Sequence, residues 1–285
     1  MKSPIKLNNL ILPKSLLNLL PSEEDPRNLI KGSRLSTKEF SKYIESIYFD
    51  GKFSKTTMPG RHSLSDKKIL ELISDNKDAR ILDVGASDGS TSLDLIKKLD
   101  GNFGKYFVTD VSFSLDVVEQ DRKSYFYDTV RKECIMIVSN RLIIYHDKLS
   151  SSLIGYIAKR LIERAPKYDA QMMKQISLVQ PELQKLVIGN SNIKLIEWSI
   201  FEPWPEEKAD IIKVANVLKT EVFSEDEITE AIKNLIENLN PDGRIIIIQN
   251  SDKEKYSFYS KVGSSLRLEA SENGGCDIDY LVKKI

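Results

Sequence analysis

The sequence predicts an α/β fold built on a mostly parallel sheet, and three features carry this prediction. Buried-type apolar runs alternate with amphipathic helical segments, which is the order of a sheet with helices on both faces. One apolar run, at 79–85, ends in a glycine and feeds a helical stretch at 91–99. Another run, at 244–249, contains four consecutive isoleucines and is typical of a strand buried on both faces.

Residues 1–63 are expected to form an N-terminal leader with a small helical cap. Ser36 and Glu39 make a capping box ahead of an apolar helical face, so a helix should begin there. The prolines and charges before this box predict an irregular segment. The main domain then spans 64–285, and its first helix opens at Ser65.

A gap of 82 residues separates the strand that ends at Asp110 from the strand that starts at Ile193. One crossover helix with its loops needs far fewer residues, so we expect an insertion at about 112–190. The segments 134–138 and 141–145 predict a hairpin inside it. Because the insertion leaves the sheet at the carboxyl end of a strand, the ligand side, we expect it to act as a lid.

The C-terminal third alternates strand and helix most clearly. A buried-type strand precedes a helix that begins at the capping box of Ser224 and Glu227. The turn at 240–243, Asn-Pro-Asp-Gly, ends this helix. Segments 265–269 and 278–282 are expected to close the sheet as an antiparallel pair. The result is a Rossmann-like sheet of seven strands, mostly parallel, with an antiparallel C-terminal strand.

Composition predicts a cytoplasmic protein without a broad nucleic-acid footprint. Lys plus Arg and Asp plus Glu both number 42, so the formal net charge is zero and no nucleic-acid partner is expected. Cys134 and Cys276 have no disulfide or metal-ligand spacing, which favours free thiols in a reducing compartment. No apolar run approaches the length of a membrane span, and the stretch 7–20 lacks a cleavage pattern.

The segment around Gly85 predicts a site for an adenosine-containing ligand. A strand that ends in glycine and feeds a helix presents backbone N–H groups and a positive dipole end to the ligand. Gly85 and Gly89 allow the backbone to approach closely. Asp110, after the second strand, can accept hydrogen bonds from both ribose hydroxyls.

The run Ile81-Leu82-Asp83-Val84-Gly85-Ala86-Ser87-Asp88-Gly89 resembles the first motif of class I S-adenosylmethionine-dependent methyltransferases. An acid precedes the first glycine in that family, and Ser87 stands where its middle glycine is usual. The resemblance implies S-adenosylmethionine as cofactor, with Asp83 near the amino group of the methionyl part. The residues expected at the cofactor are Arg61, Asp83, Gly85, Ala86, Ser87, Gly89, Asp110, Val111, Ser199, Ile200 and Asn216.

Within that set, the resemblance assigns Ser199 and Ile200 to the adenine, although the family usually has Asp or Asn at the first of these positions. Asn216 follows a strand at the place where the family contacts the cofactor or the acceptor. It is equally suited to capping the next turn. Arg61 can pair with the cofactor carboxylate, or it can be a solvated loop residue.

His62 and Asn216 are the candidate catalytic residues. His62 precedes the first core helix and can act as a base, or it can simply pack. The sulfonium is already an activated electrophile, so in-line methyl transfer asks mainly for alignment. With two histidines in the chain and no carboxylate cluster at the site, we expect no metal.

The acceptor is expected to be a small molecule methylated on oxygen, nitrogen or sulfur. A lipid or protein acceptor, or a catalytically silent cofactor-binding regulator, is the alternative. Tyrosines and a phenylalanine of the insertion can line an acceptor pocket or form its core. The stripe at 153–161 with its basic neighbours can touch a membrane surface. A nicotinamide-dependent reductase is disfavoured by Asp83 ahead of the loop.

Overall fold

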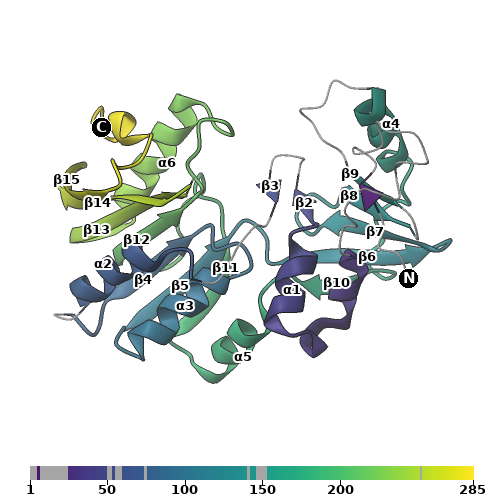
Figure 1. Cartoon of the computed structure of the whole chain (residues 1–285), viewed down its shortest axis with the longest axis horizontal. Helices are drawn as coiled ribbons and strands as arrows, with labels where there is room; N and C mark the ends of the chain where they lie inside the picture. The colour runs from purple at the N-terminus through teal and green to yellow at the C-terminus, as the bar shows by residue number, and fades with distance from the viewer. Residues whose placement is uncertain are drawn as a thin grey trace. The chain divides into compact units, whose positions relative to one another are not determined.

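The structure is a computed structural model of the chain, and it describes residues 5–6, 25–49, 53–54, 60–73, 76–139, 142–145, 153–250 and 252–285. The chain forms two compact units (Figure 1). Unit 1 consists of Met1–Thr57 with Ser112–Pro181, and unit 2 consists of Met58–Val111 with Glu182–Ile285. The N-terminal segment and the insertion, which the sequence suggests as separate parts, thus share one unit.

Unit 2 contains a mixed sheet with the order β11-β5-β4-β12-β13-β14-β15 among its described residues. Its strands are β4 (Arg80–Val84), β5 (Lys105–Asp110), β11 (Ile193–Glu197), β12 (Ala209–Ala215), β13 (Leu239–Asn250), β14 (Glu254–Val262) and β15 (Ser265–Glu272). Its helices are α2 (Ser63–Ile73), α3 (Ser90–Leu99), α5 (Pro181–Gly189, which begins at the unit boundary), α6 (Glu225–Glu237) and α7 (Asp279–Val282). The first five strands in this order are parallel, so the predicted seven-stranded, mostly parallel sheet is confirmed.

Alternate residues of β4 and β12 face opposite sides of this sheet. Leu82 and Val84 belong to a buried cluster with residues of α6 and α7, so these helices cover one face. Asp83 and Lys213 point to the other face, where their side chains contact Ser92 of α3 and Asp66 of α2. The sheet therefore carries helices on both faces.

The C-terminal strands differ from the predicted closing pair. β13, β14 and β15 form an antiparallel meander, in which β14 is a strand that the sequence reading did not assign. The segment expected as the last strand forms α7 instead. Its buried residues Ile278, Leu281 and Val282 are three and four positions apart, which is a helical period and not a strand period. The prediction of a strand at 278–282 was wrong.

Both predicted capping boxes are confirmed. Ser36 Oγ accepts a hydrogen bond from the Glu39 N–H, and the Glu39 carboxylate accepts one from the Ser36 N–H at 3.0 Å. Ser224 and Glu227 make the same reciprocal pair at 3.3 and 2.7 Å. These bonds satisfy N–H groups that a helix start leaves unpaired, so α1 (Thr37–Ile44) and α6 begin where the sequence indicates.

Unit 1 is built on its own mixed sheet, with the order β1-β9-β8-β7-β6-β10 among the described residues. Its elements are β1 (Ile5–Lys6), the 3-10 helix η3 (Pro26–Arg34), α1, β2 (Tyr48–Phe49), β3 (Phe53–Ser54), β6 (Ser114–Gln120), β7 (Lys123–Asp128), β8 (Cys134–Val138), β9 (Leu142–Tyr145), α4 (Leu153–Ile162) and β10 (Lys174–Ser177). The predicted hairpin is confirmed as the antiparallel pair β8 and β9. The predicted turn was Ser139-Asn140; Asn140 lies outside the described residues, as do Arg141 and His146.

The two faces of the unit 1 sheet are covered by different helices. Phe126 of β7 packs in a buried cluster with Phe40 of α1, whereas its neighbours Tyr125 and Tyr127 pack in a second cluster with Ile162 of α4. Because successive side chains of a strand point to opposite faces, α1 and α4 lie on opposite sides of this sheet. These aromatic residues form core, which was the alternative to an acceptor pocket.

The two units carry opposite net charges, although the whole chain is neutral. Unit 1 contains 21 Lys and Arg residues against 14 Asp and Glu residues, a formal net charge of +7. Unit 2 contains 21 against 28, a formal net charge of −7. The net charge of zero is therefore the sum of a basic unit 1 and an acidic unit 2. Within the described part of the chain, no helix is long and apolar enough to cross a membrane.

Candidate functional site

The loop between β4 and α3 adopts the left-handed backbone conformation at every second residue. The φ angle is 70° at Gly85, 60° at Ser87 and 80° at Gly89. Glycine adopts this conformation freely, whereas a residue with a Cβ pays for it in strain. Ser87 is therefore the strained position of the loop, at the point where the resembling family has its middle glycine.

Hydrogen bonds fix this loop to the end of β5. The Ala86 N–H donates to the Thr109 carbonyl at 2.8 Å, and the Ser87 N–H donates to Asp110 Oδ2 at 2.7 Å. Val111, the next residue after Asp110, is 62% exposed. The structure thus brings the predicted loop residues and Asp110 together, and one Asp110 oxygen holds the loop.

The space above both loop glycines is filled by side chains of the protein. A Cβ on Gly85 would lie 2.2 Å from Val217 Cγ2, and a Cβ on Gly89 would lie 2.2 Å from Leu183 Cδ2. Real Cβ atoms do not approach other carbons this closely, so both positions require glycine for internal packing. The glycines alone are therefore weaker evidence for a ligand than the sequence suggests.

Asp83 lies beneath the loop and is almost completely buried. Its Oδ2 accepts hydrogen bonds from the Ser92 and Tyr106 hydroxyls, both at 2.8 Å. The same oxygen lies 3.7 Å from the ammonium of Lys213, which is directly opposite Asp83 in the register of β4 and β12. Burial first, and then the Asp83 charge, raise the pKa of Tyr106, so its hydroxyl stays a donor.

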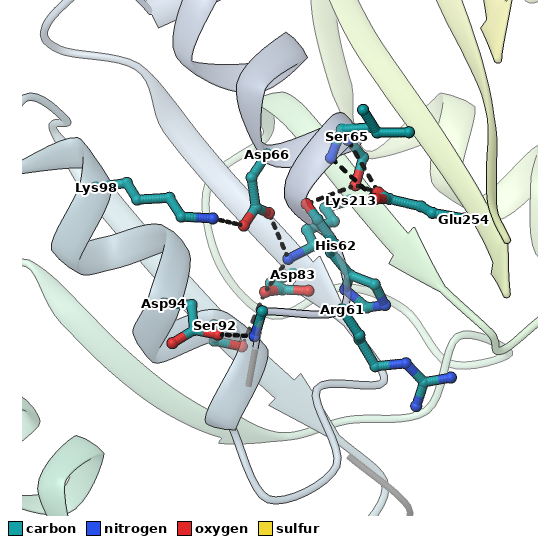
Figure 2. Close-up of polar contacts among 12 residues, drawn as sticks. Arg61, His62, Ser65, Asp66, Asp83, Ser92, Asp94, Lys98, Lys213 and Glu254 are labelled. Atoms are coloured by element: carbon teal, nitrogen blue, oxygen red, sulfur yellow. Dashed lines mark hydrogen bonds and ion pairs between the residues drawn. The ribbon is translucent and has the colours of Figure 1, made fainter. Parts of the chain in front are cut away.

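Three buried side chains, Asp66, Asp83 and Lys213, make up what we call the buried ion cluster, and the exposed Lys98 pairs with Asp66 from the surface (Figure 2). Lys213 Nζ lies 3.4 Å from Asp66 Oδ1, and Lys98 Nζ lies 2.7 Å from Asp66 Oδ2. Burial alone would lower the pKa of Lys213, but the two carboxylates outweigh it and raise that pKa. The sequence did not predict Lys213, which strand register brings to Asp83, or Asp66, which reaches Lys213 from α2.

His62 is 3% exposed, and neither ring nitrogen has a hydrogen-bond partner among the described residues. Burial, and then the charges of Lys213, Arg61 and Lys98, lower its pKa from 6.5 to about 2. An imidazole with so low a pKa takes up a proton poorly, so these surroundings oppose the expected role of His62 as a general base.

The loop that carries His62 is anchored from two sides. The Gly60 N–H donates to Asp94 Oδ2 at 2.6 Å. The N–H groups of Leu64 and Ser65 donate to the two carboxylate oxygens of Glu254 at 2.9 Å, and the Ser65 hydroxyl adds a bond of 2.5 Å. Glu254 therefore caps the N-terminus of α2 from β14, where a negative charge also favours the helix dipole.

Arg61 and Asn216 meet at Asn250, the last residue of β13. Asn216 Oδ1 accepts the Asn250 N–H at 2.8 Å, with Asn216 at φ 59°, and Asn250 Nδ2 contacts the Arg61 carbonyl at 3.5 Å. This supports the capping role for Asn216. Figure 2 shows the Arg61 guanidinium pointing away from the buried ion cluster, and partial burial lowers its pKa. The sequence reading missed Asn250.

The two residues expected at the adenine differ in exposure. Ser199 is half-buried, and its Oγ accepts the Phe201 N–H at 3.4 Å. Ile200 is buried in the cluster beneath α6, and its carbonyl accepts a hydrogen bond from Asn234 at 3.1 Å. Ile200 therefore serves the core of the sheet, and Ser199 is the one of the pair nearer the surface.

Unpaired polar atoms indicate that a polar group fits at this edge of the sheet. Both His62 nitrogens and Asn250 Oδ1 are buried and have no hydrogen-bond partner in the described part of the chain. Buried polar atoms are almost always paired, so these atoms call for a further partner. They lie at the carboxyl ends of the strands, where open α/β sheets bind their ligands.

Comparison with known proteins finds a curated relative of this chain. The chain is 22% identical over 265 residues to "Ribosomal RNA small subunit methyltransferase A" of Mycoplasma capricolum subsp. capricolum, covering 79% of this chain and 94% of that protein. The glycine loop, the sheet order and this relative agree. The chain resembles the class I S-adenosylmethionine-dependent methyltransferases in its glycine loop, and it is similar in sequence to this methyltransferase. No protein-family model matches it.

Solved methyltransferase structures are only weakly similar to this chain. An S-adenosylmethionine-dependent methyltransferase from Clostridium acetobutylicum is 13% identical, with a TM-score of 0.36 over 76% of this chain and 77% of that one. The N-methyltransferase NodS from Bradyrhizobium japonicum, in complex with S-adenosyl-L-homocysteine, is 14% identical, with a TM-score of 0.34 over 73% and 72%. Likenesses this weak say nothing about which molecule is modified.

The expectation that nucleic acid is not a partner needs correction. The curated relative of this chain is a ribosomal RNA methyltransferase by name. The error came from the net charge of the whole chain, which is zero although unit 1 carries +7. Charge acts over roughly 8–10 Å at physiological salt, so the charge of one unit matters more to a polyanion than the total.

Proposed function

We propose that the chain transfers a methyl group from S-adenosylmethionine to a nucleotide of RNA. The observation that carries this proposal is the curated relative, a ribosomal RNA methyltransferase matched along nearly its whole length. The formal charge of +7 on unit 1 supports it, because cations that neutralise phosphates provide most of the affinity for nucleic acid.

The cofactor is assigned to the carboxyl edge of the unit 2 sheet. The backbone at 85–89 would approach it, Asp110 would accept hydrogen bonds from the ribose hydroxyls, and Val111, whose side chain is exposed, would hold the adenine together with Ser199. His62 and Asn250 offer unpaired polar atoms to its methionyl part. Asp83 acts indirectly, because it pairs with Lys213 and fixes the strand beneath the loop.

The bound cofactor supplies an activated methyl group, and the protein residues position the acceptor for in-line attack on it. Alignment of this kind can provide about 7–11 kcal/mol of barrier lowering in the best intramolecular models. His62 stays neutral and takes no proton from the acceptor. Asn216 follows β12 at the same edge, where its amide can orient a nucleotide base.

A small-molecule acceptor is the second candidate, and the charge of unit 2 favours it. The unit that contains the glycine loop carries −7, which attracts a cationic or neutral small molecule rather than a phosphate backbone. In either case we place the enzyme in the cytoplasm, because Cys134 and Cys276 are both free thiols.

Calorimetric titration with S-adenosylmethionine and a methyl-transfer assay test this proposal. Micromolar cofactor binding that is lost in Asp110→Asn, but kept in the matched control Asp100→Asn at the end of α3, supports the assigned site. Transfer of labelled methyl from the cofactor to ribosomal RNA supports the acceptor. Absence of cofactor binding contradicts the whole proposal, whereas transfer to small amines or hydroxyls alone contradicts the RNA acceptor.

A further inference from the structure

The helix α4 presents an apolar and aromatic face outward from the unit 1 sheet. It packs against β8 and β9 through small and half-buried residues such as Ala158 and Ile162. Leu153 is 75% exposed and Tyr156 55%, with Ile157 and Leu161 also exposed. A helix that buries its small residues and exposes its large ones is typical of a surface that meets a partner.

Basic residues surround this face. Between 159 and 167 the chain carries Lys159, Arg160, Arg164 and Lys167, all exposed, against the single acid Glu163. Glu163 pairs with Arg160 at 3.4 Å on a solvent-exposed surface, where such a pair contributes little and a polyanion can replace it. The face therefore combines apolar contact area with positive charge.

One pair of side chains on this face has the geometry of a stacking platform. The Arg160 guanidinium carbon lies 5.4 Å from the centre of the Tyr156 ring, and its Nε donates to the Tyr156 hydroxyl at 3.1 Å. Planar guanidinium groups and tyrosine rings are the surfaces on which unpaired nucleotide bases stack. Tyr156 and Arg160 are one turn apart on α4, and Arg164 follows in the turn directly after the helix.

We propose that this face, with Tyr156, Arg160 and Arg164 at its centre, binds a single-stranded segment of the RNA acceptor. The inference rests on the proposed function and goes beyond it by assigning RNA contact to unit 1 instead of the unit that holds the glycine loop. Charge complementarity favours RNA, a polyanion, because the face belongs to unit 1, which carries +7. Arg160 and Arg164 contact phosphates, and the Tyr156 ring, whose hydroxyl accepts a hydrogen bond from Arg160, stacks a base.

Binding of a fluorescein-labelled single-stranded RNA of about 12 nucleotides, measured by fluorescence anisotropy over a salt series, tests this surface. Arg160→Gln with Arg164→Gln should weaken binding about tenfold and reduce the slope of log K against log salt by about 1.4, which is two phosphate contacts at about 0.7 each. Tyr156→Leu should weaken binding roughly 5- to 150-fold without changing that slope, because stacking is not ionic.

A matched control uses the opposite side of the same sheet. Lys38→Gln with Lys42→Gln removes two exposed positive charges from α1, which covers the other face of unit 1. This variant should leave binding within about twofold of the original protein, because surface charges beyond a Debye length are screened. Equal losses in the two double variants would overturn the assignment to α4.

A vesicle assay distinguishes RNA from a lipid surface. Cosedimentation with phosphatidylserine-containing vesicles that depends on Arg160 and Arg164, together with unchanged RNA binding in those variants, overturns the proposal in favour of a membrane contact. The test is also separate from the proposed function. RNA binding that depends on Tyr156, Arg160 and Arg164 supports this inference even where no methyl reaches RNA. Methyl transfer to RNA that is unchanged when all three residues are substituted contradicts it.

Discussion

His62 should make the stability of the protein depend on pH in a way that its removal abolishes. Its pKa is lowered to about 2 by burial, and then by the charges of Lys213, Arg61 and Lys98, whereas the unfolded value is about 6.5. Above pH 6.5 the imidazole is neutral in both states. Below pH 6.5 the unfolded chain takes up a proton that the folded chain excludes, so the free energy of unfolding falls as pH falls.

The size of the effect follows from these two values. Each pH unit between them costs about 1.4 kcal/mol, so the contribution of His62 falls by about 2 kcal/mol between pH 8 and pH 5. At pH 5 this figure depends on the unfolded pKa and hardly on the folded one. His62→Phe keeps a flat ring in the site and removes the titration. The difference in unfolding free energy between the two proteins should therefore shift by about 2 kcal/mol in favour of the variant.

Urea denaturation of both proteins at several pH values measures this difference. The second histidine of the chain, His146, is present in both proteins, so its titration cancels. A difference that stays constant within about 0.5 kcal/mol from pH 8 to pH 5 would refute the reasoning, because it would mean that folded His62 accepts a proton as readily as the unfolded chain. That outcome would also restore His62 as a candidate base.

Three further substitutions probe the site. Lys213→Met should destabilise the protein by about 3–5 kcal/mol in urea denaturation, because it leaves buried carboxylates without their cation. Adding Asp83→Asn should recover part of that loss, and additive losses from the two substitutions would contradict the pairing. Ser87→Gly should stabilise the fold by up to about 1 kcal/mol, because glycine adopts φ 60° without strain, and a lower midpoint would contradict the strain. Glu254→Gln should cost about 1 kcal/mol and speed amide hydrogen exchange at the start of α2, and unchanged exchange there would show that the cap is dispensable.

The parts of the fold that the sequence predicts correctly are those with a local signal. The capping boxes at Ser36 and Ser224 are set by residues three positions apart, and the structure confirms both. The strand with four isoleucines lies inside the sheet, as its uniform apolarity indicates. The prediction of a strand at 278–282 failed because five residues are too few for their helical spacing to outweigh a strand-like composition.

The site was predictable only in part, for a physical reason. The glycine loop and Asp110 belong to one strand–helix–strand unit, in which both follow neighbouring parallel strands, so their proximity could be inferred. Lys213 and Glu254 reach the site through sheet register and a distant strand, from 130 and 189 residues away in sequence from Asp83 and Ser65. No local pattern marks such contacts. A lysine amid the apolar residues of β12 was the one available signal, because a buried cation needs an anion beside it.

The charge of this chain shows why composition misleads when units interleave. Unit 1 is assembled from two separate stretches of sequence, 1–57 and 112–181, which carry +4 and +3, so its charge of +7 appears only when the two stretches are combined. A net charge of zero excludes a uniformly basic protein, but it does not exclude a basic unit and an acidic unit in the same chain. The acidic unit holds the glycine loop. The proposed RNA acceptor is therefore expected to draw its affinity from unit 1, and among the described residues of that unit charge, aromatic area and exposure coincide at α4 and the turn after it.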